Sequence, residues 1–267
     1  MNYNEALGLA KQFINLGISL DESVKNPAIP LEFRDQILEN LKEEETIILQ
    51  PANIITDDEE HIDWLNLEDR SDWYYWPSLR QYLLTKKSLP NSSVRSLDKE
   101  TDRILGRLAS PNQQNSFDKR GLVLGYVQSG KTSNYTALIA KAVDSGYRLV
   151  IVLTGTDKGL RLQTHRRLKR ELVGNSDGKS VPFPPVGKLW VEFTKDDLDG
   201  DFQPGFVNNA TLQGSQPVLL VIKKNSVVLR RLINWLENAP KEIMESLPLL
   251  VVDDEAEVSY WEIMWIR

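Results

Sequence analysis

The 267-residue chain contains no cysteine, which excludes disulfide bonds, cysteine-ligated metal sites and thiol nucleophiles. Histidine is nearly absent as well: only His61 and His165 occur, and we expect both at the surface and no histidine-based metal centre. No apolar run is long enough to span a bilayer, and the N-terminus lacks the basic and apolar segments of a signal peptide. The expectation is therefore a cytoplasmic protein without a membrane partner.

Acidic residues outnumber basic ones, but they are unevenly distributed along the chain. Residues 1–95 hold 17 Asp and Glu against 9 Lys and Arg, a net charge of −8, so the total of −6 leaves +2 for residues 96–267. The second part is therefore mildly basic, and nucleic-acid binding, which the total charge disfavours, stays open for it.

One stretch, residues 125–132 (GYVQSGKT), fits the phosphate-loop pattern G-x-x-x-x-G-K-[ST], known as Walker A. A short apolar run over 120–125 precedes it, and apolar residues at helical spacing follow from 132 to 143. Strand, loop and helix are the context that this motif requires. We expect backbone N–H groups to surround the phosphates and Lys131 to add positive charge at the β and γ oxygens. The predicted nucleotide contacts are Gly125, Gln128, Ser129, Gly130, Lys131 and Thr132.

A second motif follows an apolar run over 247–252, where the sequence reads Asp253, Asp254 and Glu255. A buried parallel strand that ends in carboxylates presents them at the carboxyl edge of the sheet, where ligands of open α/β sheets bind. We predict that the Thr132 hydroxyl and Asp254 hold Mg²⁺, directly or through water, and that Glu255 orients the attacking water. Lys131 and Glu255 are then the catalytic residues, and ATP and Mg²⁺ the cofactors. An acidic loop after a core strand is the alternative.

Between the two motifs, strand and helix patterns alternate, which predicts a parallel α/β sheet with flanking helices. The segments are strands over 148–154, 188–194 and 217–222, a basic helix over 158–172 and a helix over 226–237. Residues 1–95 form a separate, acidic and mainly helical region. The aromatic residues between 64 and 82 are interpreted as core or interdomain packing rather than as a platform for stacking bases.

The similarity to known sequences extends beyond the phosphate loop. Residues 121–132, 135–146, 148–155 and 160–164, with 73–77, 97–102 and 221–225, resemble the Z-one endonuclease-domain proteins. These bacterial proteins have a superfamily-2 helicase-like ATPase core and are associated with restriction and phage-defence gene clusters. The resemblance implies a RecA-like P-loop fold for residues 96–267. It also implies that Lys131 and Thr132 belong to helicase motif I and residues 254–257 to a DEAD-type motif II, in which Glu257 stands where many relatives have Asp.

The resemblance also implies a DNA partner. Residues 154–164 occupy the place of a nucleic-acid-contacting motif, and the candidate contacts on and near the basic helix are Arg161, Gln163, Thr164 and Arg167. A solvated helix face is the alternative. No nuclease residues are identified, because the nearest match, Asp177-Gly178-Lys179, is predicted to be a turn.

Residues 258–267 do not resemble the continuation of that family. We therefore expect only the first RecA-like domain, truncated after motif II, with a second one supplied by a separate chain or a missing C-terminal part. Such a sheet would keep an unpaired edge. The leading hypothesis is the ATPase portion of a DNA-dependent motor. The alternatives are a nucleotide-binding remnant without turnover and, disfavoured by the second motif, a P-loop phosphotransferase.

Overall fold

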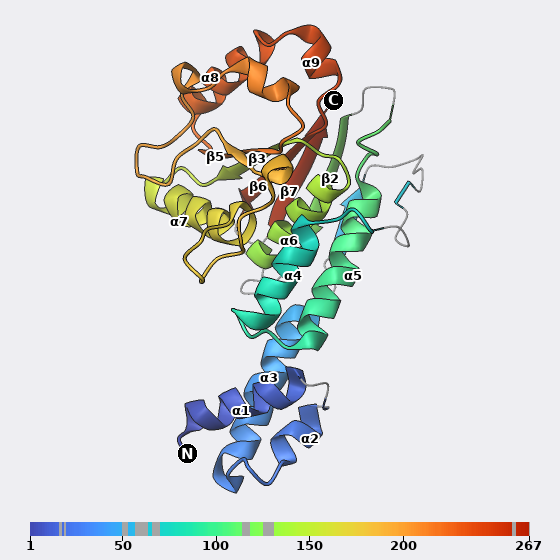
Figure 1. Cartoon of the computed structure of the whole chain (residues 1–267), viewed down its shortest axis with the longest axis vertical. Coiled ribbons are helices and arrows are strands. Elements are labelled where there is room, and N and C mark those ends of the chain that lie inside the picture. Colours follow the sequence, from blue (N-terminus) through green and yellow to red (C-terminus); the bar gives the residue numbers. More distant parts are fainter. Residues whose placement is uncertain are drawn as a thin grey trace.

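The computed structural model describes residues 1–15, 18, 20–49, 53–56, 64–65, 70–113, 118–124, 131–257 and 260–266. It has a mixed α/β sheet with flanking helices and a helical extension at the N-terminal end (Figure 1). The helices are α1 (Tyr3–Asn15), α2 (Leu20–Lys25), α3 (Leu31–Leu49), α4 (Tyr75–Thr85), α5 (Asn91–Arg107), α6 (Lys131–Asp144), α7 (Lys158–Leu168), α8 (Ser226–Glu237) and α9 (Lys241–Glu245). The strands are β1 (Asn53–Thr56), β2 (Asp118–Leu124), β3 (Leu149–Thr154), β4 (Val191–Glu192), β5 (Val218–Lys223), β6 (Leu249–Glu257) and β7 (Tyr260–Ile266).

The strands follow the order β1-β2-β7-β6-β3-β5-β4 across the sheet. Four neighbours, β4, β5, β3 and β6, are parallel, while β7, β2 and β1 continue the sheet by antiparallel pairing. The central strands are continuous apolar runs because both of their faces are covered, as is usual for parallel strands. The predicted strands over 148–154 and 217–222 are confirmed. The one expected over 188–194 is reduced to Val191–Glu192, since residues 186–188 form a 3-10 turn.

β7 corrects the expectation of an unpaired strand position after the acidic motif. Residues 260–266 turn back and pair with β6 on one side and with β2 on the other. The segment YWEIMWI consists mostly of aromatic and branched residues, which favour extended structure. The lack of resemblance between residues 258–267 and the Z-one family gave no indication of this strand.

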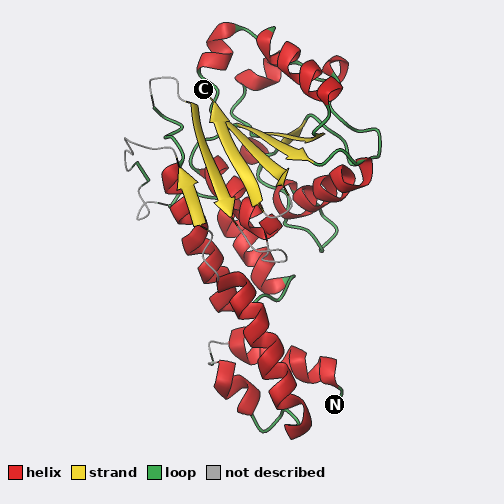
Figure 2. Cartoon of the chain, turned by 180° about the vertical axis from the view of Figure 1, so that it is seen from behind, coloured by secondary structure: helices red, strands yellow, loops and turns green. Residues whose placement is uncertain are grey.

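Two hydrophobic cores lie on opposite faces of the sheet, as the alternation of side chains along a strand requires. Val150, Val152 and Leu250 face the core shared with α4, α5 and α6, whereas Leu149 and Ile151 face the core shared with α8 and α9. A third, smaller core belongs to α1, α2 and α3 alone, and Figure 2 shows these helices extending away from the sheet. The apolar stripe predicted for residues 226–237 is confirmed as α8.

The boundary predicted at residue 95 falls inside α5, which runs from Asn91 to Arg107. Helices α4 and α5 pack on α6 and belong to the core of the sheet, so the separate helical unit consists of α1, α2 and α3. The aromatic cluster supports this arrangement: Tyr75, Trp76 and Tyr82 are buried in the same core. Its interpretation as packing is confirmed. The described helices include none with the length and apolar character that crossing a membrane demands.

A buried ion network fixes α6 against α5. Lys141, whose side chain has no exposed surface, places Nζ 2.5 Å from Asp98 Oδ1 and 2.6 Å from Asp102 Oδ1. It also donates to the Asp98 carbonyl oxygen at 2.6 Å and lies 4.6 Å from the centre of the Trp76 ring. Arg70 adds a second cation, 2.7 Å from Asp102. The helix that follows the predicted phosphate loop is therefore held by charge as well as by apolar packing.

Candidate nucleotide-binding site

The two sequence motifs meet at one edge of the sheet. Leu124, the last residue of β2, pairs with Tyr260, and Tyr260 pairs with Glu257 at the end of β6. β2 and β6 therefore run in the same direction, and their carboxyl ends are separated by a single strand, about 10 Å at the usual strand spacing. The loop residues Gly125, Gln128, Ser129 and Gly130 lie between β2 and α6, outside the described residues.

Helix α6 begins at Lys131, with Thr132 next to it in the first turn, so the helix predicted after the motif is present. The N–H groups of a first helical turn have no partner within the helix, and they favour an anion there. The side chains of Lys131 and Thr132 lie outside the described part. The next turn of the helix carries Tyr135, which is fully buried.

Tyr135 joins the two motifs. Its hydroxyl donates a hydrogen bond to Asp254 Oδ2 at 3.0 Å, so the acidic end of β6 rests against the helix that starts at Lys131. A carboxylate has two oxygens and about four acceptor positions. Asp254 is half-buried, and a carboxylate oxygen is a ligand type that Mg²⁺ prefers.

The acidic pair is divided between the two faces of the sheet. Asp253 is 8% exposed and pairs with Lys224, whose Nζ lies 2.6 Å from Asp253 Oδ2, whereas Asp254 contacts α6. Successive residues of a strand point to opposite faces, which explains this division. Asp254 is thus on the same face of the sheet as α6, the helix that begins at Lys131. Glu255 continues β6, and its side chain is not among those described. No cluster of three or more potential metal-ligating side chains occurs within the described ranges.

Arg161 does not lie on an exposed basic face. It has no exposed surface, and its guanidinium donates to the carbonyl oxygens of Lys195, at 3.2 Å, Asp197 and Val221. A guanidinium occupied in this way cannot contact DNA, so its assignment as a nucleic-acid residue is corrected. Its role is to hold the chain after β4 against β5.

His165, expected at the surface, is fully buried one helical turn after Arg161. Its Nε2 lies 3.2 Å from the Thr194 carbonyl oxygen, and burial lowers its pKa to about 4. Arg161, His165 and Leu168 share the inward face of α7 at helical spacing. Because two of these three residues are polar, the hydrophobic pattern did not reveal that face. His61 lies outside the described residues.

The other candidate nucleic-acid residues of α7 differ in exposure. Gln163 is exposed and Thr164 is half-buried. Arg167 donates to Ser133 Oγ in the first turn of α6 at 3.0 Å and to Glu171 Oε1 at 3.2 Å. Sequence reasoning did not identify this link, although the spacing of Arg167 and Glu171 is that of a helical ion pair. Arg167 therefore connects α7 to the helix of the candidate nucleotide site.

The positive charge of α7 and the turn that follows it is partly neutralised by an acidic loop at 196–201. Lys158 Nζ lies 2.5 Å from Asp199 Oδ1, and Lys169 Nζ lies 3.3 Å from Asp196 Oδ2. The surface left for a polyanion is consequently smaller than the sequence indicated. Asp177 accepts backbone N–H bonds from Lys179 and Ser180, both at 2.9 Å, and this confirms the predicted turn.

Comparison with protein-family models, with curated proteins and with solved structures gave no match for this chain.

Proposed function

We propose that the chain binds ATP and Mg²⁺ at the carboxyl edge of its sheet, as part of a P-loop, RecA-like ATPase. The observation that carries this proposal is the hydrogen bond between Tyr135 and Asp254. It joins an acidic strand end to the helix that directly follows a phosphate-loop sequence. Phosphate loop, helix start and acidic strand end are the three parts that a nucleotide site of this kind needs.

Each part has a defined task in the proposed site. The N–H groups of the loop and of the first turn of α6 bind the phosphates, and Lys131 neutralises charge at the β and γ oxygens. The Thr132 hydroxyl and Asp254 hold Mg²⁺, directly or through water. The metal ion, when bound, neutralises charge that develops on the transferred phosphoryl group. Glu255 orients the attacking water, and Tyr135 fixes the rotamer of Asp254.

The wider function is proposed from the resemblance to Z-one proteins. In that context the chain is the ATPase portion of a DNA-dependent motor of a restriction or phage-defence system, and a second RecA-like domain completes the ATP site. Gln163, Thr164 and Arg167 stay among the proposed DNA contacts, and Arg166, which is exposed on α7, takes the place of the buried Arg161. A basic residue that meets a phosphate contributes to affinity in a salt-dependent way.

Titration of ATP with and without Mg²⁺ tests the metal part of the site. Asp254→Asn removes the charge of the metal ligand but keeps an acceptor for Tyr135. We expect this variant to lose the Mg²⁺-dependent gain in ATP affinity, while Glu245→Gln, an exposed carboxylate of α9, retains it. The same Mg²⁺ dependence in Asp254→Asn and the unaltered chain would contradict the assignment.

Turnover measurements separate the proposed function from its rivals. DNA-stimulated ATP hydrolysis supports the motor. ATP binding without hydrolysis, with or without DNA, supports a nucleotide-binding protein that does not turn over. Stimulation by a small phosphoryl acceptor instead of DNA would indicate a phosphotransferase.

A further inference from the structure

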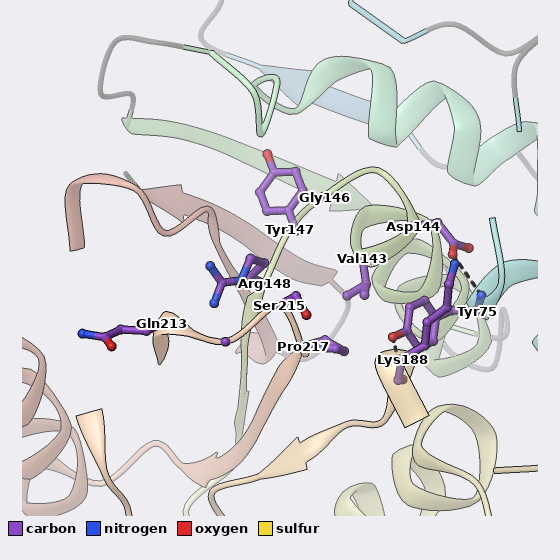
Figure 3. A pocket seen from close by; sticks show the side chains of 12 residues that line it. Tyr75, Val143, Asp144, Gly146, Tyr147, Arg148, Lys188, Gln213, Ser215 and Pro217 are labelled. Atoms are coloured by element: carbon purple, nitrogen blue, oxygen red, sulfur yellow. Dashed lines mark hydrogen bonds between the residues drawn. The ribbon is translucent and has the colours of Figure 1, made fainter. Parts of the chain in front are cut away.

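A cavity of about 460 Å³ lies at the opposite edge of the sheet from the candidate nucleotide site (Figure 3). Its walls come from the C-terminal end of α6, from the residues that lead into β3 and β5, and from the turn at Gly187 and Lys188. The 14 residues of α6 separate the two edges by about 20 Å. A ligand here would therefore not overlap the proposed ATP site. The volume lies within the usual range for small-molecule pockets.

Arg148 lines this cavity with a positive charge that no described carboxylate neutralises. Its Nη2 donates to the Leu212 carbonyl oxygen at 2.6 Å, and its Nε is buried without a hydrogen-bond partner. Burial alone lowers its pKa, and no neighbouring acid raises it. Arg148 is half-buried, so its guanidinium is partly desolvated without a carboxylate beside it, and a bound anion would offset that cost.

The other two charged residues of the cavity, Asp144 and Lys188, already have hydrogen-bond partners. Asp144 accepts three backbone N–H bonds, from Tyr74 and Trp76 at 2.7 Å and from Tyr75 at 3.0 Å. Lys188 donates to the Asp72 carbonyl oxygen at 2.7 Å. Figure 3 shows Asp144, Tyr75 and Lys188 grouped at one end of the cavity and Arg148 apart from them. Asp144 is therefore not the counter-ion of Arg148.

Ser215 provides further donors beside Arg148. Ser215 is exposed to solvent, and Figure 3 shows it between Arg148 and Pro217. Val143 and Pro217 contribute apolar wall. The cavity thus combines a planar guanidinium, a hydroxyl group and an apolar surface. These groups suit a small organic molecule that carries a carboxylate or phosphate.

We propose that this cavity binds a small molecule through a carboxylate or phosphate group held by Arg148 and Ser215, with the body of the ligand against Val143 and Pro217. Phenyl phosphate and benzoate represent the two anion types, and benzyl alcohol is a neutral control of similar size. Titration calorimetry is carried out on the Lys131→Ala variant, in which phosphate binding at the proposed nucleotide site is weakened at least about tenfold. Failure of this proposal is thereby distinguishable from failure of the ATP proposal.

We expect saturable binding of at least one of the two anions and none of benzyl alcohol. Arg148→Met should weaken that binding about 10-fold to 100-fold, the usual effect of losing a hydrogen bond to a charged group. Arg148→Lys keeps the positive charge but lacks the paired N–H donors of the guanidinium, and it should have an intermediate affinity. Ser215→Ala tests the second contact without removing a packed side chain. Arg231→Met, on the exposed face of α8, is the matched control. Equal binding by Arg148→Met and the parent, or no saturable binding of either anion, overturns the proposal.

Discussion

Replacing Lys141 by Met tests whether the buried ion network stabilises the contact between α5 and α6. Lys141 uses all three of its N–H donors, on Asp98 Oδ1, the Asp98 carbonyl oxygen and Asp102 Oδ1, at 2.5 to 2.6 Å. Methionine fills a similar volume but leaves both carboxylates and the carbonyl without this partner. Breaking a buried ion pair by removing one partner costs about 3–5 kcal/mol.

The expected cost lies near the lower end, about 3 kcal/mol, because the carboxylates are not left alone. Arg70 remains 2.7 Å from Asp102 and 3.5 Å from Asp98, and both side chains are partly exposed, at 16% and 29%. Urea unfolding measures the effect as a lower midpoint at an unchanged slope.

Lys241→Met is the control for this experiment. Lys241 pairs with Glu245 on the surface of α9 at 3.4 Å, with 85% of the Lys241 side chain exposed. Its loss should change the free energy of unfolding by less than about 1 kcal/mol. A similar small change for Lys141→Met would refute the reasoning, since the network would then be worth no more than a surface pair.

The remaining stability predictions concern α7. Burial lowers the pKa of His165 from 6.5 to about 4, so the unfolded chain binds a proton more readily than the folded one. The free energy of unfolding should therefore fall by up to about 3 kcal/mol as the pH drops from 6.5 to 4. Unfolding of the His165→Gln variant at several pH values should lack this component; an identical pH dependence in both proteins would exclude His165 as its source. Arg161→Met leaves three carbonyl oxygens without their donor and should cost about 2–3 kcal/mol and speed amide exchange after Thr194. Unchanged exchange there would show that Arg161 does not hold this loop.

The sequence predicted those parts of the fold in which local pattern and final environment agree. The apolar runs that became β3 and β5 and the stripe of α8 are examples, because burial of these side chains is the dominant contribution to their stability. The alternation of side chains along a strand also accounts for the position of Asp253 and Asp254 on opposite faces of β6.

Other features depend on contacts between distant segments. The burial of Arg161 requires the chain after β4 to fold back over α7 and offer its carbonyl oxygens, which no local pattern of charges reveals. The pairing of β7 between β6 and β2 requires a return of the chain after Glu257. The contact of Tyr135 with Asp254 joins residues 119 positions apart. The sequence alone does not indicate that this tyrosine and this acidic residue are in contact, because the folded sheet brings them together.

Nucleotide binding at the start of α6 is tested most directly by equilibrium titration of a fluorescent ATP analogue. Three chains should be compared in Mg²⁺: the unaltered protein, Lys131→Ala, and Lys241→Ala as a control for loss of an exposed lysine. Loss of a charged donor to phosphate should weaken binding at least about tenfold in Lys131→Ala alone. Equal affinity in all three proteins, or no binding by the unaltered chain, would contradict the proposed site.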